Sequence, residues 1–228
     1  AEADARFGAR ALLAAAAVAL VGIPFGLLLL LVRSRWRPLL ALDAGARDAL
    51  HGYAVDHDTF VTGMTVVSGI GSWPVYVAVF AAVVTWLLWR RLPRLAVFVV
   101  VTVLGGWALN ATMKQVVHRA RPVLLDPVAQ ARGLSFPSGH AQSAMVAYGV
   151  LLLVFLPVLA RVWRRLAVAA AVLMVLAIGF SRVALGVHYV TDVLAGYVLG
   201  AAWVAAMISV FNVWRVERGE RLYPAHRK

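Results

Sequence analysis

The chain alternates between long apolar blocks and short polar connections, a pattern that predicts helices crossing a membrane. Each block is about 16–22 residues long, which is the length a helix needs to cross roughly 30 Å of hydrocarbon. The blocks predict six spanning helices, at about residues 11–32, 74–89, 95–113, 140–160, 166–183 and 193–214. The first block is longer than the core of a signal peptide, so we expect it to remain as a helix. The sequence therefore indicates an all-α, polytopic membrane protein with one membrane-embedded domain over residues 1–228.

Residues 33–60 form a segment that is too polar to span the membrane. Apolar side chains stand among its charged residues, namely Leu39, Leu40, Leu42, Leu50 and Tyr53. One interpretation is an amphipathic helix that lies flat in the interface between lipid and water. The other is an ordinary loop that carries some apolar residues, and the pattern favours neither.

Composition supports the membrane interpretation and excludes several kinds of chemistry. Of the 228 residues, 63% are hydrophobic and 14% are charged, against about 45–50% and about 25% in soluble domains. The chain has no cysteine, which excludes disulfides and cysteine-ligated metal sites. A net charge of +12 would suggest nucleic acid in a soluble protein. Here the basic residues lie mostly in short loops between apolar blocks, so we expect no nucleic-acid partner and interpret the charge as a topology signal.

The distribution of basic residues predicts which ends of the helices face the cytoplasm. In a six-helix scheme one side receives both termini and two short connections, with Arg6, Arg10, Arg90, Arg91, Arg94, Arg161, Arg164, Arg165, Arg215, Arg218, Arg221, Arg227 and Lys228. Because cytoplasmic loops carry an excess of Lys and Arg, this side is expected to be cytoplasmic, with both termini. Arg33, Arg35 and Arg37 fall on the other side and oppose the rule without overturning it.

A first polar cluster follows the third predicted helix. Lys114 and Arg121 are seven residues apart, or two helical turns, so they are expected to share one helix face. Pro122 disfavours helix at Arg121, which places the expected end of the helix there. Two cations at a helix end suit a doubly charged anion, although basic side chains also extend toward headgroups without any such role.

A second cluster, Pro137-Ser138-Gly139-His140, opens the fourth predicted helix. Ser138 is a good N-cap, and the free N–H groups at a helix start bind phosphate. A simple capped helix start explains Ser138 and Gly139, but it does not explain His140 at a membrane surface.

The third cluster is Ser181-Arg182, followed by His188 and Asp192. His188 and Asp192 are four residues apart and face each other if this stretch is helical. A carboxylate bonded to one imidazole nitrogen fixes the tautomer and leaves the other nitrogen basic. Arg182 adds a planar fork of donors for phosphate oxygens. The alternative is an interfacial salt bridge between His188 and Asp192.

All three clusters fall at helix ends on the predicted extracytoplasmic face, and ionisable residues at membrane depth are usually functional. Lys114-x6-Arg121-Pro122, Pro137-Ser138-Gly139-His140 and Ser181-Arg182-x5-His188-x3-Asp192 resemble the three signature motifs of the type 2 phosphatidic acid phosphatase superfamily, with all eleven signature residues in order. The motifs span residues 114–192, and the six-helix layout extends the resemblance over most of the chain. That superfamily also includes soluble vanadium haloperoxidases and membrane glucose-6-phosphatases, so the motifs define the site better than the substrate.

The resemblance implies a reaction through a phosphohistidine. His188 attacks phosphorus, Asp192 orients His188, and His140 protonates the leaving oxygen and then activates water. The phosphoryl oxygens are held by Lys114, Arg121, Arg182, Ser138 and Gly139. No metal and no cofactor is expected, because Asp192 is the single carboxylate among the motif residues. His118 and Arg119, inside the first motif, either line the site or face headgroups.

These observations predict a metal-independent phosphatase of the cell membrane, with its site on the extracytoplasmic side. The expected partners are the bilayer and a lipid that carries a phosphomonoester or terminal pyrophosphate, with no obligate protein partner evident. Undecaprenyl pyrophosphate, phosphatidylglycerophosphate and phosphatidic acid all remain open as substrates. Two alternatives are a transporter or channel whose charges line a pathway near the bilayer midplane, and a vanadate-dependent haloperoxidase, against which the membrane embedding argues.

Overall fold

The computed structural model describes Ala19 and residues 22–211, and every regular element in that part is helical. A short apolar helix, Gly22–Arg33, comes first. The elements that follow are α2 (Arg37–Val55), α3 (Asp58–Ile70), α4 (Trp73–Trp89), α5 (Pro93–Val117), α6 (Gly139–Phe155), the 3₁₀ helix η1 (Leu156–Val158), α7 (Arg161–Ala184) and α8 (Val190–Phe211).

Within the described residues, five helical segments are long and apolar enough to cross a membrane: Asp58–Trp89, Pro93–Val117, Gly139–Val158, Arg161–Ala184 and Val190–Phe211. They confirm the multi-pass prediction and overlap each of the blocks expected from residue 74 onward. The first predicted block, residues 11–32, begins outside the described residues, as does the end of the last block at residues 212–214. The helix Gly22–Arg33 is the described remainder of the first block.

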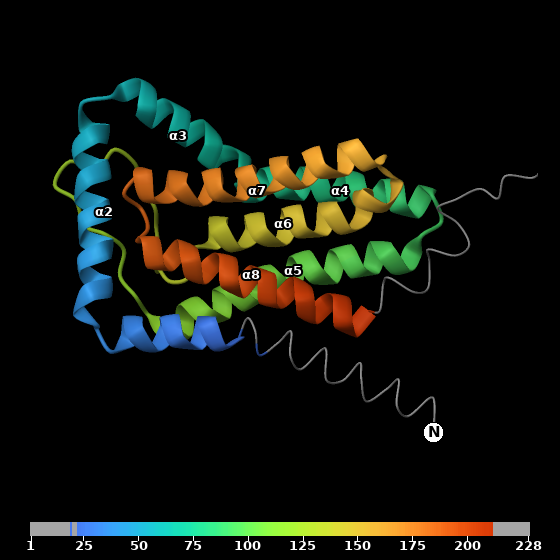
Figure 1. Ribbon diagram of the computed structural model, residues 1–228, viewed down its shortest axis with the longest axis horizontal. Helices are drawn as coiled ribbons and strands as arrows, with labels where there is room; N and C mark the ends of the chain where they lie inside the picture. The colour runs from blue at the N-terminus through green and yellow to red at the C-terminus, as the bar shows by residue number, and fades with distance from the viewer. Residues whose placement is uncertain (1–18, 20–21, 212–228) are drawn as a thin grey trace, which may run out of the picture.

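Figure 1 shows helices α4 to α8 lying side by side in one bundle, with α2 crossing one end of it. Residues 33–60 are mostly helical, so the segment is not an ordinary loop. Because α2 lies across the bundle and exposes Leu40, Leu42 and Tyr53, it has the features of an interfacial helix. Helix α3 was not predicted, since its 13 residues mix Thr, Ser and Gly with apolar side chains.

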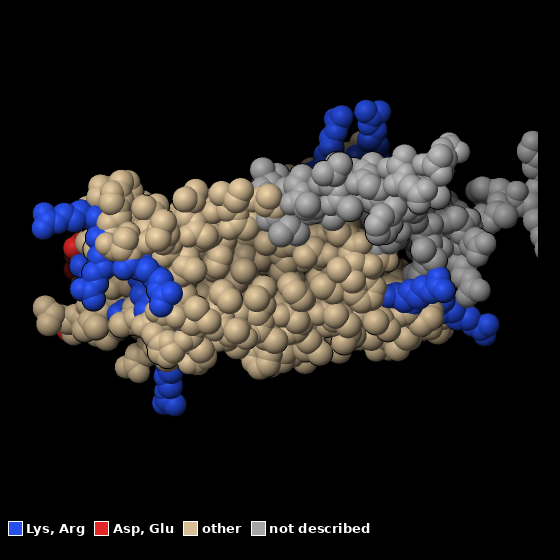
Figure 2. Space-filling view, turned by 90° about the horizontal axis from the view of Figure 1, so that it is seen from below, with Lys and Arg blue, Asp and Glu red and all other residues tan. Residues whose placement is uncertain are grey.

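Charged side chains gather toward the ends of the bundle. The two basic connections, α4–α5 and η1–α7, lie at the end opposite α2 (Figure 1). The middle of the face seen in Figure 2 is free of Lys, Arg, Asp and Glu, as a surface in contact with lipid tails requires. The relative placement of the predicted basic loops and of the three motifs, at opposite ends, is therefore confirmed.

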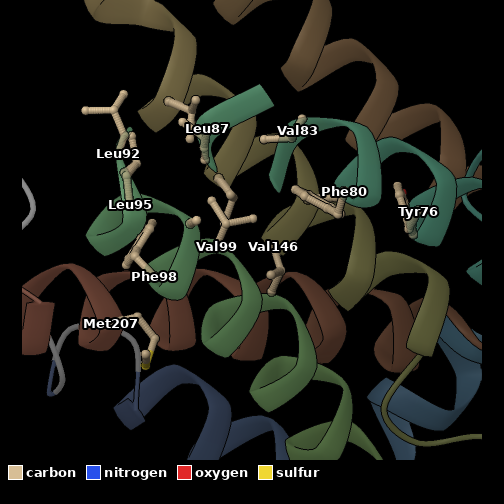
Figure 3. Packing of buried hydrophobic residues seen from close by; sticks show 14 residues of the cluster. Tyr76, Phe80, Val83, Leu87, Leu92, Leu95, Phe98, Val99, Val146 and Met207 are labelled. Atoms are coloured by element: carbon tan, nitrogen blue, oxygen red, sulfur yellow. The ribbon is translucent and has the colours of Figure 1, made fainter. Parts of the chain in front are cut away.

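A hydrophobic cluster holds the bundle together between α4, α5, α6 and α8. Figure 3 shows Phe80 and Leu87 of α4, Phe98 and Val99 of α5, and Met207 of α8 in this cluster. Glycines allow α8 to approach α6 more closely than other residues would. A Cβ on Gly196 would stand 2.7 Å from the backbone oxygen of Ser138, and a Cβ on Gly200 would stand 2.9 Å from that of Gln142. The close packing of α8 against α6 fixes the position at which α6 begins.

Candidate active site

Four helix ends meet beneath α2, and they carry the predicted site residues. Lys114 lies in the last turn of α5 and Arg182 in the last turn of α7. Ser138 is the N-cap of α6, Gly139 and His140 open that helix, and Asp192 lies in the first turn of α8. Arg121 and His188 stand in the connections between helices. Every predicted site residue is thus placed at one end of the bundle.

The expectation that Lys114 and Arg121 share a helix face is wrong. Helix α5 ends at Val117, and His118 takes a left-handed conformation with φ of 50° at the C-cap. Arg121 reaches the site from the extended connection instead, where its guanidinium donates to the backbone oxygens of Gly133 (3.1 Å), Val187 (2.7 Å) and Arg132 (3.1 Å). These hydrogen bonds fix the position of the guanidinium although Arg121 does not belong to a helix.

The predicted pair of His188 and Asp192 is present. The Nδ1 atom of His188 lies 3.4 Å from Oδ2 of Asp192, and both side chains are buried. The other ring nitrogen, Nε2, lies 3.0 Å from Nη1 of Arg121. Because a guanidinium only donates, Nε2 must be the accepting nitrogen and the ring proton of neutral His188 lies on Nδ1. The basic nitrogen of His188 therefore faces the cationic groups of the site.

The 3.4 Å separation is long for a hydrogen bond. Catalytic hydrogen bonds are often long without substrate and tighten when it binds.

Asp192 is held from several directions. Its Oδ2 accepts hydrogen bonds from the hydroxyl of Ser135 and from the backbone N–H of Tyr189 (2.9 Å). The second bond resembles half of a capping box, in which a third-position side chain reaches back to the start of its helix. Its Oδ1 accepts from Nη1 of Arg119 at 2.6 Å. The carboxylate is thereby fixed in one orientation before any substrate arrives.

Burial sets the protonation of the two site residues that lie in the connections. It lowers the pKa of His188 to about 4, although the hydrogen bond and the charge of Asp192 act in the opposite direction. Burial also lowers the pKa of Arg121, against the raising effect of Asp192. His188 is consequently a neutral nitrogen base across the physiological pH range.

Donors around the site have unused hydrogen-bonding capacity. Arg182 donates from Nη1 to the Ser68 hydroxyl at 2.5 Å, while its buried Nε has no partner among the described residues. The buried hydroxyl of Ser138 likewise lacks a partner there and makes no cap bond to α6. The Nζ of Lys114 donates to the backbone oxygen of Leu134 at 2.5 Å. Because an ammonium group carries three donors, Lys114 has further protons to offer.

Electrostatic interactions connect these groups with the second histidine. His140 interacts with Lys114, Arg121, Arg182 and His188. Lys114 in turn interacts with Arg121, Arg182 and Asp192. The three cations of the motifs therefore interact with His140, and two of them, Arg121 and Arg182, also interact with His188. This arrangement is suited to an anion.

The sequence did not predict the contribution of Asp43 and Ser135. Ser135 lies two residues before Pro137. A single serine in a connection carries no sequence signal that distinguishes it from an ordinary loop residue. Asp43 comes from α2, and its carboxylate accepts from Thr191 and Arg119. Arg119 was expected either to line the site or to face headgroups. It contacts Oδ1 of Asp192, the oxygen that does not face His188, and so lines the site.

Comparison with known proteins relates this geometry to a family. Residues 94–215 match the model of the PAP2 superfamily. The chain belongs to the PAP2 superfamily. This confirms the resemblance to type 2 phosphatidic acid phosphatases.

One relative of this PAP2 chain and one solved structure illustrate how far the similarity extends. Phosphatidylglycerophosphatase B of Bacillus subtilis (strain 168) is 42% identical over 95 residues, which cover 40% of this chain and 46% of that protein. The alignment thus spans less than half of the relative's length. The crystal structure described as the first transmembrane PAP2 type phosphatidylglycerolphosphate phosphatase from Bacillus subtilis superposes with a TM-score of 0.77. It is 22% identical and covers 89% of this chain and 98% of that one, so the two share a fold.

The PAP2 region contains most, but not all, of the residues assembled at the site. It includes the eight predicted site residues together with Arg119 and Ser135. Helix α2 and Asp43 lie outside it, on the N-terminal side. Among the described residues, no three His, Cys, Asp or Glu side chains cluster in a way that would hold a metal ion.

Proposed function

We propose that this PAP2 protein is a membrane lipid phosphatase that works through a phosphohistidine on His188. The observation that carries the proposal is the accepting Nε2 of His188, which lies against Arg121 at the same end of the bundle as Lys114, Arg182 and the unpartnered donors of Ser138 and Arg182. Such donors are costly to bury unless a ligand uses them. The negatively charged oxygens of a phosphoryl group would accept from these donors.

The proposed reaction has two steps. In the first, Nε2 of His188 attacks phosphorus, the new N–P bond forms as the bond to the lipid oxygen breaks, and His140 protonates that oxygen. Asp192 stabilises the positive charge that develops on the imidazole ring. In the second, His140 takes a proton from water, whose oxygen bonds to phosphorus while the N–P bond breaks. The products are a dephosphorylated lipid and inorganic phosphate, with no metal or cofactor involved.

Three motif side chains stabilise the charge in both steps. Arg182, Lys114 and the hydroxyl of Ser138 approach the equatorial oxygens, together with the free N–H groups at the start of α6. Removing one donor of this kind typically costs about 100- to 1,000-fold in kcat. Arg121 now bonds Nε2 of His188. When the phosphoryl group binds, this bond breaks and Arg121 donates to a phosphoryl oxygen instead.

The position of the site supports a lipid substrate. It lies at the helix ends that α2 crosses (Figure 1). If α2 lies in the interface, a headgroup would meet the protein there while its chains stay in the bilayer. A transporter would place its charges near the bilayer midplane instead. We infer that phosphatidylglycerophosphate belongs to the substrate range because a relative is named for that activity. Undecaprenyl pyrophosphate and phosphatidic acid are the other candidates.

The proposed location is the extracytoplasmic face of the plasma membrane. It follows from the basic connections at the opposite end of the bundle, which the positive-inside rule assigns to the cytoplasm. A cysteine introduced at exposed Leu125, near the site, is expected to react with a membrane-impermeant thiol reagent in intact cells. A cysteine at exposed Trp89 is expected not to react. The reverse result would place the site in the cytoplasm.

The proposed activity is tested by phosphate release from the three lipids, in detergent and in the presence of EDTA. The protein is expected to release phosphate from at least one of them, and His188→Ala is expected to abolish that release. Rapid quenching with radiolabelled substrate should trap a label that is stable to base and labile to acid, as a phosphohistidine is. Folded protein that releases no phosphate, or that needs a divalent ion, would contradict the proposal.

A further inference from the structure

The two buried carboxylates of the described residues share one arginine. Asp192 is 0% exposed and Asp43 is 2% exposed. Arg119 donates from Nη1 to Asp192 at 2.6 Å and from Nη2 to Asp43 at 2.7 Å. A buried carboxylate without a counter-charge is strongly destabilising. Arg119 therefore neutralises part of the negative charge on both sides at once.

Further contacts fix this arginine between α2 and α8. Its Nη1 also donates to the hydroxyl of Thr191 at 2.6 Å, and its guanidinium carbon lies 4.1 Å from the ring centroid of Tyr189. A guanidinium that is bonded and stacked in this way has little freedom to move. Both of its Nη atoms are engaged by Asp192, Asp43 and Thr191 rather than by motif residues that bind phosphate in the proposed mechanism.

Asp43 connects the arrangement to α2. It accepts hydrogen bonds from the backbone N–H of Thr191 (3.0 Å) and from the Thr191 hydroxyl (2.6 Å). Thr191 lies in the first turn of α8, where N–H groups have no partner within the helix. A side chain of the interfacial helix thus caps the helix that carries the catalytic carboxylate.

We propose that Arg119 is a positioning residue that sets the orientation and effective charge of Asp192, and that Asp43 acts through it to couple the seating of α2 to the catalytic pair. This inference rests on the proposed phosphohistidine function. It concerns residues that touch neither the phosphate nor the attacking nitrogen.

If Arg119 acts through its charge, removing it changes the pKa of His188, whereas a purely structural role would leave that pKa unchanged. Asp192 acts on His188 with a negative charge that Arg119 partly balances. Arg119→Gln removes the balancing charge, so the imidazolium form of His188 is favoured and the acidic limb of kcat/KM moves to higher pH. Asp43→Asn leaves Arg119 to balance Asp192 alone, so the limb moves to lower pH. The double variant restores the original charge, and its limb returns toward that of the wild type.

Other charged groups near the pair stay constant in these variants. Arg121, Arg182 and His140 interact with His188, and Lys114 interacts with Asp192. The uncharged Ser135 hydroxyl also bonds Asp192. The second pKa of a phosphomonoester substrate, about 6, contributes its own limb that is the same for every variant. Differences between variants therefore report the Asp43–Arg119–Asp192 group.

The experiment measures kcat, KM and the pH profile of kcat/KM for wild type, Arg119→Gln, Asp43→Asn and the double variant. Asp48→Asn is the matched control on α2, because its carboxylate pairs with Arg47 at 2.7 Å but is 62% exposed. Partners that orient a catalytic or metal-bound histidine typically contribute about 10- to 100-fold. We expect a loss of that size in kcat for Arg119→Gln, with KM unchanged, a smaller loss for Asp43→Asn, and wild-type values for Asp48→Asn.

Opposite pH shifts of the two single variants, with recovery in the double variant, support the proposal. Equal losses without any shift of the limb, or a rise in KM, would overturn it. If Arg119→Gln does not yield folded protein, Asp43→Asn decides alone by the presence or absence of a shift to lower pH. An inactive but folded wild type would instead contradict the phosphatase function itself.

Discussion

Replacing Gly196 with alanine tests whether α8 holds in place the end of α6 that is proposed to bind phosphate. A Cβ at this position would lie 2.7 Å from the backbone oxygen of Ser138 and 3.0 Å from the Cβ of Ala141, whereas ordinary contact begins at 3.4 Å. The helices must therefore separate by several tenths of an ångström. Because the obstacle is backbone, no side-chain rotation relieves it.

The displacement falls on the N-cap of α6, where Ser138 and Gly139 are proposed to hold the phosphoryl group. Overpacking of this kind costs about 1–3 kcal/mol of stability. A misplacement of about 1 Å at a catalytic group costs roughly 100-fold in rate. For a smaller shift we expect kcat/KM to fall by about 10-fold or more, with a lower midpoint of thermal unfolding in detergent.

Two other glycines at the same interface provide the comparison. A Cβ on Gly149 would meet Val204 at 3.5 Å, which is ordinary contact, so Gly149→Ala should keep wild-type activity. A Cβ on Gly200 would lie 2.9 Å from the backbone oxygen of Gln142, one turn further from the site. Gly200→Ala should therefore lose stability as Gly196→Ala does, but less activity. Unchanged kcat/KM in Gly196→Ala, or equal damage in Gly149→Ala, would refute this account of the α6–α8 contact.

The other predictions concern protonation, the catalytic carboxylate and the buried polar network. Because burial lowers the pKa of His188 to about 4, the neutral form persists above that pH and is lost below it, so the His188 limb of kcat/KM should lie near 4. Stability should fall as the pH drops from the ordinary value of 6.5 toward 4, since only the unfolded chain takes up the proton in that window; thermal unfolding across this range checks the sign. Ser135→Ala removes a hydrogen bond to Asp192 and should lower kcat about 10-fold at constant KM, whereas Ser209→Ala, at an exposed hydroxyl of α8, should not. Asn110→Ala leaves the buried Gln142 oxygen without the donor that now lies at 2.5 Å and should cost about 1–3 kcal/mol; equal unfolding midpoints for Asn110→Ala and the exposed control Thr112→Ala would contradict this.

The spanning helices follow from hydropathy because lipid enforces both length and helical structure. The block expected at 74–89 is α4, Trp73–Trp89, within one residue. Helices α5 and α7 are longer than their apolar blocks: α5 continues to Val117 rather than 113, and α7 begins at Arg161 rather than 166. Hydropathy detects the part of a helix that crosses hydrocarbon, and Lys114 or Arg161 extends the helix beyond that part. The exact first and last residues of these helices could therefore not be predicted from hydropathy and are known only from the structure.

The site was predictable where one short stretch carried its own chemistry. Ser138-Gly139-His140 and His188 with Asp192 are recognisable from spacing, and the structure brings them together as expected. The prediction that Arg121 lies on the same helix as Lys114 was wrong. His118 takes a left-handed conformation and ends α5 four residues before Pro122, the helix-breaking residue in the sequence. A local signal such as Pro122 marks where a helix cannot continue, not where it stops.

Asp43 was beyond prediction for a different reason. Its function depends on α2 folding back across the bundle, and nothing in residues 33–60 indicates which helix end it meets. The charge balance of the chain nevertheless indicates which kind of partner such a buried acid must have. The chain has 10 acidic residues against 22 basic ones, so an acid that becomes buried finds a basic partner readily, and one buried beside a catalytic carboxylate must share that partner or repel it. Asp43 shares Arg119 with Asp192, and helix α2 thereby becomes part of the electrostatics of the proposed site.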